Sequence, residues 1–286
     1  MSIQDQNAGA VDDTHRSGGA GSSDNPFAQL NAESAELQKT VISYLDAVAA
    51  HHEMQRVRAA AFEVFAPAAG ERLLDAGCGV GEVARQLGER VGGRGSVAAI
   101  DLSEHVIAAA RSRNDGRPVD YAVGDITALD FPDDHFDGVR CERVLQHVQD
   151  PDIALKELAR VTRPGGRVCV IDTDWSSSVG DGFDHLEQVV ADFFPVDTDL
   201  VAGRAIRSRM VKSGLRSTTI LPVTLRFTSL ADAGVIVPFF NSTFAQSRLS
   251  AELFDRFYDS VYRSVDRGDF LFAFTMWIGL GRVPLH

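Results

Sequence analysis

The hydrophobic pattern first predicts two amphipathic helices. Across residues 31–65, apolar side chains recur every three or four positions, which is the spacing of one helix face. The two helices are joined near His51 and His52, Asn31 is placed to cap the first, and Pro67 stops the second. The apolar positions are Leu37, Val41, Tyr44 or Leu45, and Val48 in the first helix, and Met54, Val57, Ala61, Val64 and Phe65 in the second.

From Arg72 onward, short apolar runs alternate with helical runs, which predicts a parallel sheet with helices on both faces. We expect strands at residues 72–76, 96–100, 119–123, 136–141 and 167–172. Helical segments follow at 183–194 and 201–213, and late strands at 217–228 and 270–283. Two late strands separated by an insertion fit an antiparallel pair at one edge. The predicted fold is α/β: a Rossmann-like, seven-stranded, mostly parallel sheet with an antiparallel final strand.

The same pattern suggests how the chain is divided. Residues 1–25 contain almost no large apolar side chain, so they cannot offset the entropy of ordering and are expected to be a disordered tail. Residues 26–68 are expected to form a helical cover, and residues 69–286 the main domain, with a helical insertion at about 228–268. The cover and the insertion would together form a lid over the active site.

The stretch from Leu73 to Glu82, LLDAGCGVGE, predicts a buried strand, a tight turn and the start of a helix. Gly77 and Gly79 stand where the backbone needs positive φ or close approach to a ligand, and the following helix N-terminus offers free N–H groups. The glycine spacing differs from G-x-G-x-x-G, and no Lys-Ser/Thr follows, which disfavours dinucleotide and P-loop sites. Asp75 would repel a diphosphate but suits a cation such as S-adenosylmethionine (SAM), which carries a sulfonium and an ammonium.

Acidic residues also end the next two predicted strands, where ligands of open α/β sheets bind. Asp101 lies about as far beyond Gly77 as a carboxylate that takes both ribose hydroxyls, and a carboxylate suits a vicinal diol because it only accepts hydrogen bonds. The alternative is that Asp101 caps a helix. Asp125 could bind the exocyclic amine of adenine while Leu102 and Ile126 pack on the ring faces, or it could cap a turn.

Together these motifs resemble those of class I SAM-dependent methyltransferases, the group that includes the ubiquinone/menaquinone-biosynthesis C-methyltransferases. The resemblance covers residues 73–175, and residues 270–284 resemble the last strand of actinobacterial small-molecule methyltransferases. The matching segments are Leu74–Gly81, Asp101, Gly124-Asp125, Phe131–Asp133, Phe136-Asp137, Val144–Val148 with Asp150-Pro151, and Leu158–Gly166.

The resemblance implies particular cofactor contacts. Gly77 and Cys141 would offer backbone carbonyls to the methionine ammonium, while Asp101 would hold the ribose and Asp125 the adenine. Glu142 and Arg143, which follow the fourth strand, would lie beside the methionine moiety.

Other side chains are candidates for the methionine end and for the acceptor. Arg56, early in the second helix, could pair with the methionine carboxylate, or it could be solvated. Methyl transfer needs alignment, and it needs a general base only if the acceptor must lose a proton. His147 is the candidate base, against the alternative that it only packs the turn. Tyr44 and Trp175 are candidate acceptor contacts, although Tyr44 also fits the core.

Composition narrows the partners. The net charge of −12 argues against nucleic acid. Three scattered cysteines are too few for a disulfide framework or a zinc site, and no histidine–carboxylate cluster has metal-ligand spacing, so no metal is expected. Without a membrane-length apolar run or a signal pattern, the cytoplasm is the expected compartment and no membrane partner is expected. A homodimer is left open.

The expected function is transfer of a methyl group from SAM to an O, N or C atom of a small molecule, in specialised or cofactor metabolism. One alternative is a SAM-binding regulatory or scaffold protein without methyl transfer. Another is a nicotinamide-dependent oxidoreductase, which would require a third glycine one position later and a catalytic Tyr-Lys or His pair, neither of which is present.

Overall fold

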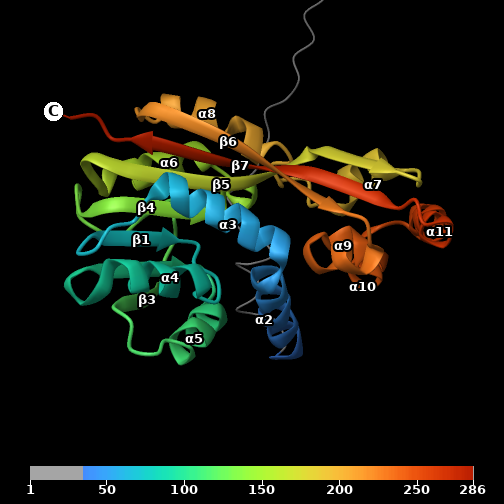
Figure 1. The fold of residues 1–286 in the computed structure, drawn as a ribbon, viewed down its shortest axis with the longest axis horizontal. Coiled ribbons are helices and arrows are strands. Elements are labelled where there is room, and N and C mark those ends of the chain that lie inside the picture. Colours follow the sequence, from blue (N-terminus) through green and yellow to red (C-terminus); the bar gives the residue numbers. More distant parts are fainter. Residues whose placement is uncertain (1–34, 286) are drawn as a thin grey trace, which may run out of the picture.

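The computed structural model describes residues 35–285, which form a seven-stranded sheet with the strand order β3-β2-β1-β4-β5-β7-β6 (Figure 1). The expected tail at 1–25 and the Asn31 cap lie outside the described residues. The strands are β1 (Arg72–Ala76), β2 (Ser96–Asp101), β3 (Val119–Val123), β4 (Phe136–Glu142), β5 (Thr162–Asp181), β6 (Arg216–Phe227) and β7 (Leu271–Arg282).

Helices connect and flank these strands. The longer ones are α2 (Ala35–Ala50), α3 (His52–Phe65), α4 (Glu82–Val91), α5 (Glu104–Ser112), α6 (Pro151–Arg160), α7 (Leu186–Phe193), α8 (Ala202–Lys212), α9 (Leu230–Ile236), α10 (Ser242–Arg248) and α11 (Ala251–Arg267). The 3-10 turns among residues 35–285 are η2 (Gly92–Arg94), η3 (Leu145–His147) and η4 (Pro238–Phe240).

The sheet is parallel from β3 to β5, and β7 runs antiparallel to both β5 and β6. This confirms the predicted mostly parallel sheet with an antiparallel final strand. Strand β1 lies between β2 and β4, so the order of the strands reverses between β1 and β4. The carboxyl ends of these strands therefore surround the position where ligands of such sheets bind.

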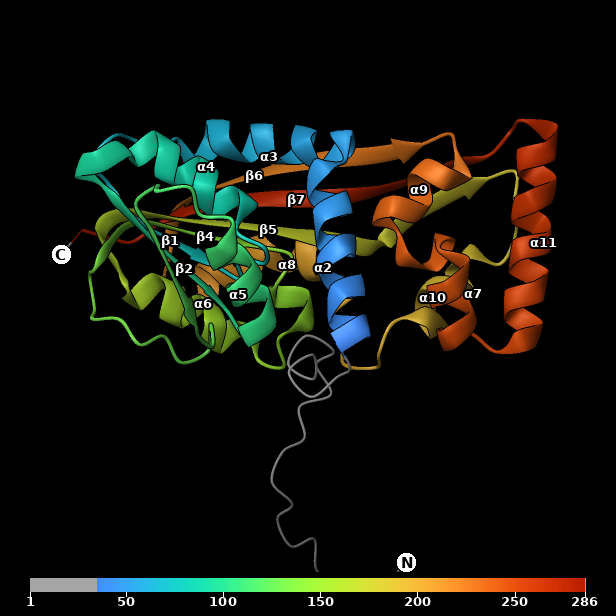
Figure 2. The same ribbon diagram turned by 90° about the horizontal axis from the view of Figure 1, so that it is seen from below.

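Strand β5 differs from its expected bounds. The sequence pattern predicts it at residues 167–172, but it runs from Thr162 to Asp181. At its start Thr162 pairs with Phe136 of β4, and at its end pairing with β7 reaches Asp174 and, after a register shift, resumes at Val179 opposite Ala273. The serines at 176–178 fall in the register shift between Asp174 and Val179, and Gly180 pairs with Phe272, which is far away in the sequence, so this stretch gives no local strand signal. The long strands β5, β6 and β7 reach from the main body toward α11 (Figures 1 and 2).

Apolar side chains pack on both faces of the sheet. Figure 2 shows α3 and α4 along one side and α6 along the other. Met54, Val57 and Phe65 of α3 are fully buried in one core cluster, and Leu155 of α6 and Met210 of α8 are fully buried in the second. The predicted apolar stripe of α3 is therefore the face that packs on the sheet.

The N-terminal helices also contact the insertion. The helical conformation is interrupted between α2 and α3 at His51, which has an extended backbone and caps α3 through its side chain. The Tyr44 hydroxyl donates to the Ile236 carbonyl of α9 at 2.9 Å, and Asp46 pairs with Arg113 near the end of α5 at 2.6 Å. Helix α2 is thereby held between the main body and the insertion.

Candidate functional site

The glycine loop joins β1 to α4. Gly77, Gly79 and Gly81 all have positive φ, at 79°, 52° and 77°, which is the left-handed region that favours glycine. At Gly77, an added Cβ would lie 2.1 Å from Cγ2 of Val144, so the close approach of the loop to the segment after β4 requires glycine. Gly81 is the N-cap of α4 and has no side-chain cap. The first N–H groups of α4 are thus available beside the loop.

A cavity of about 1150 Å³ lies over this loop and the carboxyl ends of β1, β2 and β4. Helix α2 borders it through Leu45, Val48 and Ala49, and the segment after α7 borders it through Pro195 and Val196. The predicted site residues that line it are Asp75, Gly77, Gly79, Asp101, Leu102, Asp125, Ile126, Arg143 and His147. Tertiary structure thus brings most of the predicted cofactor residues to one cavity.

Asp101 ties the second strand to the loop. One carboxylate oxygen accepts the Gly79 N–H at 3.0 Å and the other accepts the Ser103 N–H at 3.1 Å. Helix α5 is capped by the Ser103 hydroxyl, which accepts from Val106, so Asp101 is not its N-cap. Burial raises the pKa of Asp101, and the backbone hydrogen bonds oppose that rise. A carboxylate held by two N–H groups still has lone pairs for a diol.

Asp125 lies after β3 and is exposed. Its Oδ1 accepts both the Thr127 N–H at 2.8 Å and the Thr127 hydroxyl at 2.7 Å. One carboxylate oxygen therefore caps the turn, as the alternative interpretation predicted. Ile126 beside it is buried, and both residues line the cavity. The carboxylate is therefore fixed at the cavity wall by its own turn.

A buried ion network forms the wall of the cavity next to the loop. Arg140 of β4 lies 3.5 Å from Asp75 and contacts Glu142, and Arg58 of α3 reaches Glu142 at 2.9 Å and Glu82 at 2.5 Å. Arg58, Arg140 and Glu82 are not among the site residues predicted from the sequence. Arg140 did carry a signal, because a charged residue inside an otherwise apolar buried strand needs a partner.

The two central carboxylates respond differently to burial. The pKa of Asp75 is raised to about 6 by burial, against the attraction of Arg140. The pKa of Glu142 is lowered to about 2: burial raises it, but the attraction of Arg58 and of Arg140, with their hydrogen bonds, outweighs burial. The difference follows from the geometry, since two guanidiniums contact Glu142 and one lies near Asp75.

Asp75 also has an incomplete hydrogen-bond set. Its Oδ2 is buried and has no hydrogen-bond partner among residues 35–285. A buried acceptor without a partner is costly, and a cationic N–H donor would satisfy it. The residues present therefore fit SAM: the glycine loop allows close approach, Asp75 and Glu142 complement positive charge, and Asp101 suits a diol.

His147 and Arg143 lie on the segment after β4. Arg143 has a left-handed φ of 57°, and its N–H donates to the Ile171 carbonyl at 2.8 Å, which holds it in that strained conformation. His147, at the end of η3, is half-buried. Burial lowers its pKa to about 4, with a further contribution from the positive charge of Arg143, so the imidazole is neutral at pH 7.

Arg56 does not lie at the cavity, contrary to the sequence-based expectation. Its exposed guanidinium contacts Glu53 and the Thr224 carbonyl of β6. Arg58, two positions later, lines the cavity instead. Side chains two residues apart on a helix point about 200° apart around its axis, so only one of the two arginines can face the loop.

Three further candidates also lie elsewhere. Trp175 is buried in the core and donates its indole N–H to Oε1 of Gln146 at 2.9 Å, so it supports the segment that carries His147 rather than lining the cavity. Tyr44 faces the insertion through its bond to α9. The Cys141 side chain is buried in the core, and its neighbour Glu142 lines the cavity.

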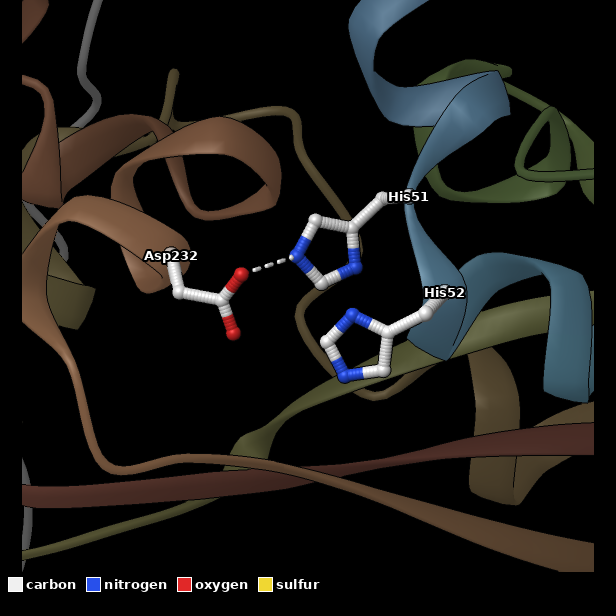
Figure 3. Close-up of side chains that lie close together, drawn as sticks. All are labelled: His51, His52 and Asp232. Atoms are coloured by element: carbon white, nitrogen blue, oxygen red, sulfur yellow. Dashed lines mark hydrogen bonds and ion pairs between the residues drawn. The ribbon is translucent and has the colours of Figure 1, made fainter.

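A separate group of side chains lies where α2 and α3 meet α9. His51, His52 and Asp232 are close enough together to hold a metal ion (Figure 3). Sequence spacing could not reveal this group, because Asp232 comes from the insertion. His51 Nδ1 accepts the Glu53 N–H at 3.1 Å and Nε2 lies 2.9 Å from Oδ1 of Asp232, so both ring nitrogens already have partners. His51 thus connects the start of α3 to α9 of the insertion.

The fold and the cavity agree with one class of protein. The strand order, the glycine loop after β1 and the carboxylates at the ends of β1 and β2 have the arrangement expected of a class I methyltransferase. Residues 74–170 match the family described as methyltransferase domain. This match covers about a third of the chain and includes most of β1, the glycine loop and β2 to β4.

The chain is also similar to individual curated proteins over part of its length. The chain is 35% identical over 191 residues to an uncharacterised 37.1 kDa protein in transposon TN4556 of Streptomyces fradiae, covering 65% of this chain and 55% of that protein. It is 36% identical over 107 residues to a 2-phytyl-1,4-naphtoquinone methyltransferase of Synechococcus elongatus, covering 36% of this chain and 46% of that protein. The chain thus spans about half the length of these curated relatives.

The fold is shared with Haemonchus contortus phosphoethanolamine N-methyltransferase 2, solved in complex with S-adenosyl-L-methionine. The TM-score is 0.59 at 20% sequence identity, covering 91% of this chain and 60% of that chain. Within the described part of the chain, no helix has the length and apolar character needed to cross a membrane.

Proposed function

We propose that this chain is a methyltransferase that moves the methyl group of SAM to an O, N or C atom of a small-molecule acceptor. The observation that carries the proposal is the acidic wall beside the glycine loop. Asp75, Glu82 and Glu142 line the cavity against two arginines, Arg58 and Arg140. A net negative wall favours a sulfonium with its ammonium and disfavours the diphosphate of a nicotinamide cofactor.

The cavity is large enough to hold both SAM and an acceptor. At about 1150 Å³, the cavity exceeds the 300–1,000 Å³ that is typical for one small molecule. Its lining also includes Leu45, Val48 and Val196, which suit an acceptor with an apolar body, and Arg248 of α10. We propose that the protein acts in the cytoplasm, on a small molecule of specialised metabolism. Light scattering would show whether it forms a homodimer.

The chain's own residues would position the reaction. SAM, when bound, supplies an electrophilic methyl group on a sulfonium. Arg58 and Arg140 hold Glu142 in place, Asp101 fixes the loop through Gly79, and α2 covers the cavity. Neutral His147 can accept a proton from an acceptor hydroxyl or amine, and proton transfer of this kind contributes about 10²–10⁴-fold.

Calorimetry tests the proposal. The full chain should bind SAM and S-adenosylhomocysteine and not NAD, and the reverse preference would overturn the assignment. Asp101→Ala should weaken SAM binding by more than ~1 kcal/mol because it removes a charge-assisted acceptor. Asp130→Ala is the matched control, since Asp130 is exposed and does not line the cavity. SAM binding without release of S-adenosylhomocysteine on any acceptor would instead favour a regulatory or scaffold protein.

A further inference from the structure

A second cavity, of about 1030 Å³, lies between α2 and the insertion. Helix α2 contributes Tyr44 and Ala47, α10 contributes Phe244, and α11 contributes Tyr258. The cavity shares no lining residue with the cofactor cavity. It is large enough for a drug-sized molecule.

The lining of this second cavity is uncharged. None of the described residues that border it is Asp, Glu, Lys, Arg or His, although 24% of the whole chain is Asp, Glu, Lys or Arg. The cofactor cavity, in contrast, is lined by Asp75, Asp101, Glu142, Arg58 and other charged side chains. A charged ligand in the second cavity would lose hydration without gaining a counter-charge, which opposes its binding.

Aromatic rings and hydroxyl groups form much of the wall. The rings of Tyr44 and Phe244 meet edge to face, with centroids 6.1 Å apart. Phe240 and Phe270 border the same space, and Ser43 of α2 adds a hydroxyl. Rings offer faces and edges for stacking, and hydroxyls both donate and accept hydrogen bonds.

We propose that this cavity is a binding site for an uncharged, largely aromatic molecule that carries hydroxyl or carbonyl groups. The site is separate from the SAM site and does not depend on methyl transfer. Two helices are walls common to both cavities. Helix α2 presents Leu45 and Val48 to the cofactor cavity and Tyr44 and Ala47 to the second one, while α10 presents Arg248 to the first. A ligand in the second cavity therefore packs against the elements that close the first.

Fluorescence titration of the full chain tests the site with two probes. Nile red is neutral and aromatic and should bind saturably with one molecule per chain, whereas the anionic dye 8-anilinonaphthalene-1-sulfonate should bind at least tenfold more weakly. Ala47→Glu places a charge in the cavity at an exposed helical position and should weaken Nile red binding at least tenfold. Ala50→Glu is the matched control, because Ala50 is exposed on the same helix and lines neither cavity.

A second charged variant keeps the test independent of α2. Thr243→Glu adds a charge to the same cavity at the start of α10, where a carboxylate favours the helix, and it should also weaken Nile red binding at least tenfold. Circular dichroism checks that each variant is folded. Unchanged Nile red affinity in folded Ala47→Glu and Thr243→Glu, equal binding of the two dyes, or full displacement of Nile red by S-adenosylhomocysteine would each overturn the proposal. Because S-adenosylhomocysteine binding is measured separately, failure of this site and failure of the proposed SAM site can be told apart.

Discussion

The Arg58 guanidinium of α3 donates to the Glu142 carboxylate at the end of β4 across 2.9 Å. The same guanidinium reaches Glu82 in the first turn of α4 at 2.5 Å. One side chain thus joins the N-terminal cover, the glycine-loop helix and the switch point of the sheet. Both Arg58 and Glu142 are largely buried, with side-chain exposures of 12% and 7%, so the pair lies where desolvation matters.

Replacing Arg58 should be costly for stability. In Arg58→Met, Glu142 and Glu82 lose a buried partner, and breaking such a pair from one side costs about 3 kcal/mol of unfolding free energy. Arg256→Met on α11 breaks an exposed pair with Glu252, so it should change the unfolding free energy by less than about 1 kcal/mol. Urea denaturation measures both. Equal losses in the two variants would contradict the role given to Arg58.

The loop glycines should differ in their tolerance of alanine. Gly77→Ala and Gly79→Ala both place a side chain at positive φ, but only Gly77 has a neighbour, Val144, in the way. We expect Gly77→Ala to lose about 2 kcal/mol more unfolding free energy than Gly79→Ala, which is the usual cost of overpacking. Adding Val144→Ala to Gly77→Ala should recover part of the difference. No recovery would mean that the backbone, not Val144, sets the cost.

SAM binding should weaken in acid because of Asp75. The pKa of Asp75 in the ligand-free chain is about 6, so its carboxylate is neutral below that pH and no longer attracts a cation. Affinity should fall by up to about tenfold per pH unit below pH 6. Asp75→Asn should flatten this dependence, measured by calorimetry between pH 5 and 8. Glu142 is not the titrating group, since its pKa of about 2 leaves it ionised throughout.

The ligand-free chain should show the opposite trend in stability. The pKa of Asp75 is higher in the folded chain, at about 6, than its ordinary value of 3.8. The folded state therefore binds the proton more tightly, and the contribution of Asp75 to unfolding free energy rises as pH falls from about 6 to 4. Comparing the wild type with Asp75→Asn by urea denaturation isolates this contribution. A contribution that instead falls over this range would contradict the raised pKa.

His147 should affect turnover more than binding. If it accepts the acceptor's proton, His147→Ala loses at least about 100-fold in kcat, while SAM affinity changes little. Since the pKa of His147 is about 4, its neutral form persists well below pH 6, and the acid limb of kcat/KM due to this group should lie near pH 4. Undiminished kcat in the variant would leave His147 a packing residue.

Trp175 should act through hydrogen bonding in the core. Trp175→Phe removes the N–H that Oε1 of Gln146 accepts, and an unsatisfied buried acceptor costs about 1–3 kcal/mol. Trp277→Phe is the control, because the Trp277 N–H makes a longer bond of 3.3 Å to Asp174, whose Oδ2 also accepts from Arg204. Thermal unfolding should rank the Trp175 variant as less stable. The reverse order would place Trp175 outside this supporting role.

The local patterns of the sequence determined the fold and the cofactor loop. Alternation of period two and stripes of period 3.6 report which face of an element is buried, and these patterns predicted β1 at Arg72–Ala76 and β3 at Val119–Val123 with their observed bounds. Gly77 and Asp101 were predictable for the same reason: backbone conformation and position at a strand end are properties of a short stretch of chain.

Side-chain partnerships were decided only by tertiary structure. Whether Arg56 or Arg58 faces the cavity depends on how α3 is rotated against the sheet, and the length of β5 depends on pairing with β7, a strand far away in the sequence. Trp175, expected at the acceptor, is buried in the core because the insertion and β7 surround it with rings such as Phe274. These contacts depend on distant segments that pack together, and no local pattern encodes which segment will be the neighbour.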